Sequence, residues 1–163
     1  MRVFLDTNVL VSAVATRGLC ADVLREVLSS HDLIISKHLL NELKDVLQRK
    51  FGIPSPLISE FIDMLQQDTI LVNPDNPPQI QIKDKDDLMI LSAALTANAD
   101  LLVTGDKELL ALDKVKNLEI VSPMLFLNRL KSSYLNYLTE SAVLLNARTA
   151  FTHPNPNELE IEV

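Results

Sequence analysis

The chain alternates short runs of apolar residues with longer segments of helical periodicity, and this alternation constrains its fold most. The apolar runs have the length of buried strands and lie at residues 2–6, 32–36, 69–72, 100–105 and 118–121. Helical patterns lie between or after them, at residues 21–30, 37–50, 55–67, 85–99, 106–112 and 124–147. All-apolar strands that alternate with helices of about 10–15 residues are typical of a parallel sheet covered on both faces. With right-handed crossovers, the pattern predicts a three-layer α/β/α sandwich with a central, mainly five-stranded parallel sheet.

The length and composition predict how the chain is divided. Of its 163 residues, 47% are hydrophobic but only 4% are aromatic, so the core must be aliphatic. We expect one α/β domain over residues 1–130, an additional C-terminal helix over 131–148 and a flexible acidic tail over 149–163. The helical segment 124–147, which runs across that boundary, has an apolar stripe that is expected to cover the core or a second subunit: Leu127, Leu130, Leu138 and Val143.

Composition also limits the kind of protein. The single cysteine, Cys20, excludes an internal disulfide and fits a reducing compartment. No cleavable leader is visible and no stretch approaches the ~20 apolar residues of a membrane span, so we expect a soluble cytoplasmic protein. The net charge of −7 argues against general binding to nucleic-acid phosphates, but it allows an enzyme whose acids surround metal ions. Only three glycines are present, which excludes a G-x-G-x-x-G dinucleotide site.

Four acidic residues stand in positions that strand and helix chemistry does not demand. Asp6 ends the first strand, and Asp106 follows the fourth by a short turn. Asp87 opens an apolar helix, and Glu42 borders the buried face of another. In open α/β sheets the working crevice lies at the carboxyl ends of the strands, where Asp6 and Asp106 are expected.

Each acid also has a purely structural interpretation. Asp6, Asp87 and Asp106 could be helix caps or first-turn acids, and Glu42 could pair with Lys37 or Lys44 on the surface. Together, however, three carboxylates at neighbouring strand ends would repel one another unless cations neutralised them. Carboxylate clusters without His or Cys suit Mg²⁺ or Mn²⁺, which activate water for phosphodiester hydrolysis.

At these residues the chain resembles the PIN-domain nucleases, and most of all the toxin components of bacterial toxin–antitoxin pairs. The segments that carry the resemblance are "FLDTNVLVSA", "SKHLLNELKDVLQRKF", "DKDDLMILSAALTANADLLVTGDKELLAL" and "IVSPMLFL", in the family's order within residues 2–130. The resemblance implies a metal-dependent ribonuclease that cuts single-stranded or structured RNA and leaves 5′-phosphate and 3′-hydroxyl ends. It also implies a cognate antitoxin as a possible partner and a possible homodimer.

The resemblance places the family's acidic quartet on Asp6, Glu42, Asp87 and Asp106, as ligands of one or two metal ions. Asn8 and Thr104, the latter at the position of the family's small hydroxyl residue, are implied as supporting residues, and Asp84 is an additional candidate helper from its place beside the site. Two departures stand out. Leu88 follows the third acid, where a small polar residue is common, and Leu109 occupies the place of a fifth acid, leaving Glu108 as the nearest substitute.

Two other functions remain open on the sequence. A phosphatase with a nucleophilic aspartate after the first strand needs a second aspartate two residues later, where this chain has Asn8. A non-catalytic module that keeps the fold but only binds RNA or a protein is the stronger alternative, and the missing fifth acid favours it. Seven basic residues could form a rim that grips RNA, although a solvated surface explains them equally well: Lys37, Lys44, Arg49, Lys50, Lys83, Lys85 and Lys107.

Overall fold

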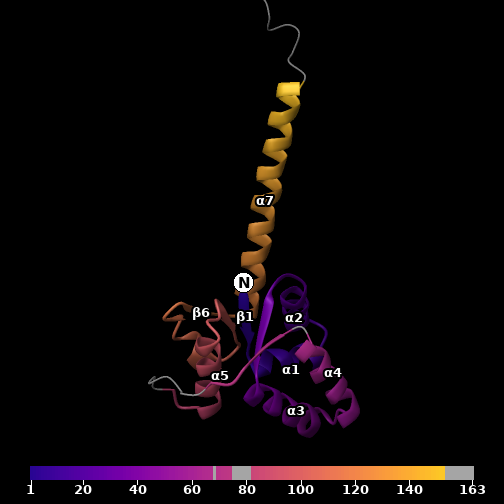
Figure 1. Cartoon of the computed structure of the whole chain (residues 1–163), viewed down its shortest axis with the longest axis vertical. Coiled ribbons are helices and arrows are strands. Elements are labelled where there is room, and N and C mark those ends of the chain that lie inside the picture. The colour runs from indigo at the N-terminus through magenta and orange to yellow at the C-terminus, as the bar shows by residue number, and fades with distance from the viewer. Residues whose placement is uncertain (68, 75–81, 153–163) are drawn as a thin grey trace, which may run out of the picture. The chain divides into compact units, whose positions relative to one another are not determined.

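The computed structural model describes residues 1–67, 69–74 and 82–152, with residues 143–152 described by their backbone alone. The chain divides into two compact units, Met1–Phe126 and Leu127–Val163. The first unit contains the whole sheet, and helices lie on both sides of it (Figure 1). The predicted three-layer α/β/α sandwich is therefore confirmed.

The sheet has six strands in the order β3-β2-β1-β4-β6-β5. Their bounds are β1 Arg2–Leu5, β2 Asp32–Ser36, β3 Thr69–Val72, β4 Leu101–Val103, β5 Lys114–Val115 and β6 Leu118–Val121. All neighbours are parallel except β5, which pairs antiparallel with β6. The sequence predicted the five parallel strands and missed β5. Its two residues are too few for a periodic pattern, and it turns back at Lys116, whose φ is 55°.

The helices are α1 Thr7–Ala15, α2 Leu19–Ser30, α3 Lys37–Phe51, α4 Ser55–Gln67, α5 Lys85–Thr96, α6 Lys107–Leu110 and α7 Pro123–Thr152. All but α1 were expected. Helix α1 starts directly after β1 and contains three β-branched valines. Its sequence, TNVLVSAVA, is therefore as compatible with a continued strand as with a helix. The turn from strand to helix therefore falls at Asp6 with no connecting loop.

The centre of the sheet lies in the core. The side chains of Val3, Phe4 and Leu5 in β1 have no exposed surface. The chain adds β2 and β3 on one side of β1, then crosses back to add β4 and β6 on the other, so the strand order reverses between β1 and β4. In parallel α/β sheets this reversal opens a crevice at the carboxyl ends of the two strands. Asp6 follows β1 and Thr104 follows β4 at this place.

In the second unit, α7 continues without a break through residue 130 to Thr152. Leu127 and Leu130 are half-buried, whereas Leu135 and Leu138 expose 62% and 45% of their surface. The boundary at residue 130 and the flexible tail from residue 149 stay predictions, and residues 153–163 lie outside the described part.

Within the described residues, no single helix combines the length and apolar composition of a membrane span. Helices α1 and α2 together meet that test, by length and composition only, as a pair bent by 107°.

Candidate active site

Asp6 is the most buried acid of the chain's described part, with 1% of its surface exposed. It stands at the N-cap position of α1, but its side chain makes no capping hydrogen bond. Its Oδ2 instead accepts a hydrogen bond of 2.7 Å from Thr104 Oγ1. The cap interpretation therefore fails for this side chain, whose carboxylate is directed toward β4.

Thr104 connects the first and fourth acids. Its fully buried hydroxyl donates to Asp6 and accepts a 3.0 Å hydrogen bond from the backbone N–H of Asp106. Asp106 does cap α6, because its Oδ1 accepts from the N–H groups of Glu108 and Leu109 at 2.7 and 3.1 Å. The cap occupies one carboxylate oxygen and leaves Oδ2 outside these bonds. Capping and metal binding are thus compatible at Asp106.

Glu42 lies on α3, half-buried, and its Oε2 accepts a 2.6 Å hydrogen bond from Thr7 Oγ1. Thr7 exposes only 1% of its surface in the first turn of α1. Among the described residues, the ion pairs do not include one between Glu42 and Lys37 or Lys44. The side chain of Glu42 is thus held toward the end of β1, and the surface-pair alternative is wrong.

Electrostatic coupling joins Glu42 to Asp6. Burial raises the pKa of Asp6, and the negative charge of Glu42 raises it further. The hydrogen bond from Thr104 and the nearby backbone N–H groups of Asn8 and Thr7 act in the opposite direction. Asp6 is therefore a buried carboxylate whose charge is supported by hydrogen-bond donors at fixed positions.

Asp87 brings the remaining acids together. Its pKa is raised to about 6, mainly by burial and in addition by the negative charges of Asp106, Asp84, Asp6 and Glu108, in that order. A carboxyl group responds in this way only to charges that lie close to it. The four predicted ligands, Asp6, Glu42, Asp87 and Asp106, therefore share one region at the carboxyl edge of the sheet.

The supporting residues have different positions. Asp84 is exposed and caps α5 by accepting a 2.8 Å hydrogen bond from the N–H of Asp86. The side chain of Asn8 is exposed, while its backbone N–H faces Asp6. Asp84 thus lies close enough to Asp87 to affect it electrostatically, and Asn8 acts on Asp6 through its backbone.

The place of a fifth acid is not filled by a carboxylate. Leu109 is fully buried in the core. Glu108 accepts a 3.0 Å hydrogen bond at Oε1 from the N–H of Lys83. Glu108 contributes negative charge near Asp87, but this bond ties it to the segment before α5.

The donor set fits a hard divalent cation. All four predicted ligands are carboxylates, and such oxygens without His or Cys suit Mg²⁺ or Mn²⁺. As the side chains stand, no group of three His, Cys, Asp or Glu residues in the described ranges is close enough to hold an ion. Mutual repulsion works against closer approach, and a cation would reverse that effect.

Sequence reasoning missed Thr7, which orients Glu42. The signal was the buried hydroxyl residue immediately after Asp6, and it becomes readable only once residues 7–15 are known to be helical. No sequence signal identified His38 as a neighbour of the site either. It lies one turn before Glu42 on α3, and its Nε2 is 3.1 Å from Asp86 Oδ1 at the start of α5.

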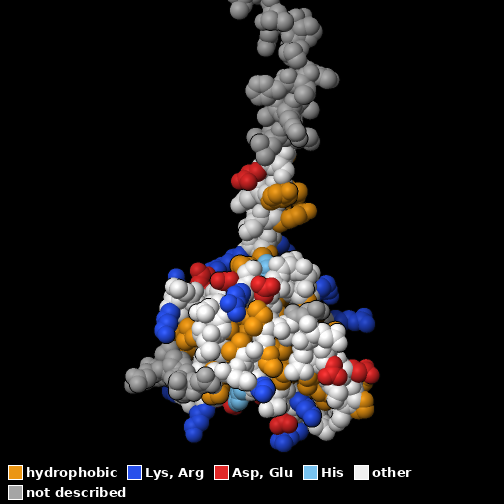
Figure 2. Space-filling view, in the orientation of Figure 1, with side chains coloured by type: hydrophobic (Ala, Val, Ile, Leu, Met, Phe, Trp, Pro, Cys, Tyr) orange, Lys and Arg blue, Asp and Glu red, His pale blue; other side chains and the backbone are white. Residues whose placement is uncertain are grey.

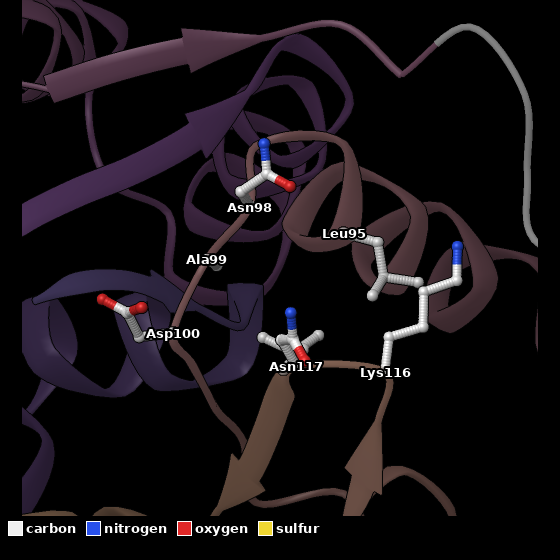
Figure 3. Close-up of a pocket in the computed structure, with 7 residues that line it drawn as sticks. Leu95, Asn98, Ala99, Asp100, Lys116 and Asn117 are labelled. Carbon is white, nitrogen blue, oxygen red and sulfur yellow. The ribbon is translucent and has the colours of Figure 1, made fainter.

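A separate cavity of about 220 Å³ lies at the opposite, amino edge of the sheet. The labelled side chains of Asn98, Asp100, Lys116 and Asn117 surround it in Figure 3. None of the predicted site residues lines this cavity, so the acidic region is a distinct place on the molecule.

Comparison with known families gives one match, to the model of the PIN domain, over residues 2–108. Comparison with the curated proteins gives no match.

Solved structures have a similar fold. One is the structure of VapBC2 from Rickettsia felis bound to a DNA fragment from its promoter. It contains a chain 19% identical to this one, with a TM-score of 0.55 over 75% of this chain and 98% of that one. VapBC-1 from nontypeable Haemophilus influenzae is 21% identical, with a TM-score of 0.54 over 76% and 99%. VapC20 from Mycobacterium tuberculosis, a toxin that cleaves the sarcin–ricin loop, is 14% identical, with a TM-score of 0.53 over 72% and 98%. At these identities the likeness is one of fold.

Proposed function

The chain belongs to the PIN-domain family, and we propose that it is a metal-dependent endoribonuclease that hydrolyses RNA phosphodiester bonds. The observation that carries the proposal is the pair of threonine hydrogen bonds, 2.7 and 2.6 Å long, that hold the carboxylates of Asp6 and Glu42 at the carboxyl edge of the sheet. The raised pKa of Asp87, to which four other carboxylates contribute by their charge, supports it. A folded protein rarely gathers so many like charges unless they serve a site.

Asp6, Glu42, Asp87 and Asp106 would hold Mg²⁺ or Mn²⁺. When bound, such an ion lowers the pKa of water and stabilises the charge that develops on the phosphate. Thr104 and Thr7 fix the carboxylates of Asp6 and Glu42 through hydrogen bonds of 2.7 and 2.6 Å. These buried donors hold two of the ligand oxygens in defined directions, and the acids would still have to move closer together before three of them could share an ion.

The wider biological proposal is a toxin of a toxin–antitoxin pair. It is supported by a fold like that of chains in VapBC structures. A cognate antitoxin protein would be the partner, and the chain would act in the cytoplasm, where its RNA is found. Because VapC20 cleaves the sarcin–ricin loop, structured RNA is a substrate class to test besides single strands.

The test is cleavage of a labelled single-stranded RNA and of a labelled RNA hairpin by the full chain in Mn²⁺. We expect shortened products with 5′-phosphate ends, and no products in EDTA. Asp6→Asn, purified in the same way, controls for contaminating nucleases and should be inactive. Equal cleavage by Asp6→Asn and wild type would overturn the assignment of the site.

A non-catalytic RNA- or protein-binding module is the second candidate. Two observations favour it. Leu109 is buried in the core, and Glu108 accepts a hydrogen bond from the N–H of Lys83, so neither supplies a fifth carboxylate to the site. Retained RNA binding without cleavage in either Mn²⁺ or Mg²⁺ would decide for this alternative.

A further inference from the structure

A groove of about 310 Å³ runs between α3 and α4, which lie side by side (Figure 1). We call it the α3–α4 groove. Its lining is Lys37, Leu40, Asn41, Lys44, Ser59, Ile62, Asp63 and Gln66. None of these residues belongs to the acidic site.

The lining consists of two facing helical stripes. Lys37, Asn41 and Lys44 stand at positions i, i+4 and i+7 of α3, so they share one face of that helix. Ser59, Asp63 and Gln66 repeat the same spacing on α4. Leu40, which is buried, and the half-buried Ile62 complete the lining. The groove therefore has polar walls with two aliphatic contacts.

The groove begins at the same edge of the sheet as the acidic site. Lys37 is the first residue of α3 and directly follows Ser36, the last residue of β2. The next residue, His38, lies 3.1 Å from Asp86 at the start of α5, which also carries Asp87. An RNA strand bound at the acidic site can therefore continue along α3 into the neighbouring α3–α4 groove.

The charge of the groove differs from that of the whole chain, which carries a net −7. Two lysines and one acid line it, and in the part of the chain that the structure describes neither Lys37 nor Lys44 is among the ion-paired residues. Figure 2 shows Lys and Arg side chains over α3 on the visible face. The two lysines are about 10 Å apart along the helix axis, as seven residues of an α-helix require.

We propose that the α3–α4 groove binds the sugar–phosphate backbone of a single-stranded RNA segment next to the cleaved bond. The inference rests on the proposed ribonuclease function. Lys37 and Lys44 contact phosphates, and the amides of Asn41 and Gln66 are placed to hydrogen-bond to sugar or base. The carboxylate of Asp63 repels phosphate but accepts a hydrogen bond from a ribose 2′-hydroxyl, which RNA has and DNA lacks. This mixture of groups fits RNA better than an apolar protein segment.

The test is the salt dependence of RNA binding by the full chain carrying Asp6→Asn, which keeps the RNA intact. Fluorescence anisotropy of a labelled single-stranded RNA gives the binding constant at several salt concentrations. Each phosphate contact on a single strand contributes about −0.7 to the slope of log K against log salt. Lys37→Ala and Lys44→Ala should each reduce the slope by about 0.7, the double variant by about 1.4, and Lys44→Arg should restore it.

Lys50→Ala is the matched control, since Lys50 is an exposed lysine of the same helix outside the groove. Alanine favours helix at all three positions, so folding is preserved, as circular dichroism can confirm. Slopes for Lys37→Ala and Lys44→Ala equal to that of Lys50→Ala would overturn the proposal and leave a protein segment as the occupant. If only the ribonuclease proposal is wrong, the result differs: Lys37→Ala and Lys44→Ala still reduce the slope, but the chain with Asp6 intact cleaves no RNA.

Discussion

The two edges of the sheet use acidic residues in opposite ways. At the amino edge, Asp100 Oδ2 accepts a 2.7 Å hydrogen bond from the backbone N–H of Arg2. The backbone of Asp100 also pairs with Arg2 and with Glu119. This single carboxylate joins the ends of neighbouring strands and faces a donor.

At the carboxyl edge, the acids face one another. Asp87 is affected by four other carboxylates, and Asp6 by Glu42. The hydrogen-bond donors Thr7 and Thr104 hold individual oxygens in place but bring no positive charge. One edge therefore uses an acid for stability, whereas the other holds like charges close together, an arrangement typical of functional sites.

The largest difference between the edges should come from removing one charge at each. Asp106→Asn keeps the cap of α6, because Asn caps helices about as well as Asp. It should nevertheless lower Mn²⁺-dependent RNA cleavage by about a hundredfold or more, since even partners of metal ligands typically contribute 10–100-fold. Asp100→Asn, which can still accept from Arg2, should cleave like wild type. Initial cleavage rates measure both, and equal rates would abolish the distinction between the edges.

Thr104→Val should have the next largest effect. Valine has nearly the shape of threonine but removes the side-chain donor of the buried Asp6 carboxylate, at a cost of about 1–3 kcal/mol. Denaturant unfolding should show this loss, and cleavage should fall with it.

Thr104→Ser provides the control, because it keeps the hydroxyl. Recovery of most activity in Thr104→Ser supports a positioning role for the hydrogen bond. If Thr104→Val cleaved like wild type, the link between the first and fourth acids would have no functional role.

Glu42→Gln should act mainly on metal binding. The glutamine can still accept from Thr7 but carries no charge, so the Mn²⁺ concentration for half-maximal cleavage should rise about tenfold. Titration of cleavage with Mn²⁺ measures this. An unchanged Mn²⁺ requirement would place Glu42 outside the metal site.

The smallest effect concerns pH. The pKa of Asp87 is raised from 3.8 to about 6, so the folded chain holds a proton there more tightly than the unfolded chain does. The stability that this group contributes is lost as the pH rises from about 4 to 6, and the full penalty remains at pH 7. In EDTA, Asp87→Asn should therefore melt at a higher temperature than wild type at pH 7, and this difference should vanish near pH 4. A constant difference across this range would contradict the raised pKa.

Much of the fold could be predicted because each strand is a short apolar run with a distinct end. The same strand ends pointed to Asp6 and Asp106, and the helix contexts to Glu42 and Asp87. The main feature that the sequence did not reveal is helix α1. Its valines continue the apolar character of β1, so neither the helix nor the bond from Thr7 to Glu42 was visible. Likewise, the sequence offered seven basic residues for a rim, and only packing of α3 on α4 places Lys37 and Lys44 together in one groove.

The hydrogen bond between Thr104 and Asp6 is also expected to form late in folding. It joins residues 98 positions apart, at the ends of two strands that pair only after most of the domain has been made. Contacts of such long range form late, because closure of the intervening loop must come first. A nascent chain that ends before β4 lacks Thr104 and Asp106, so a growing polypeptide cannot assemble the acidic site. In refolding from denaturant, the proposed RNA cleavage should accordingly recover later than the helical circular dichroism signal.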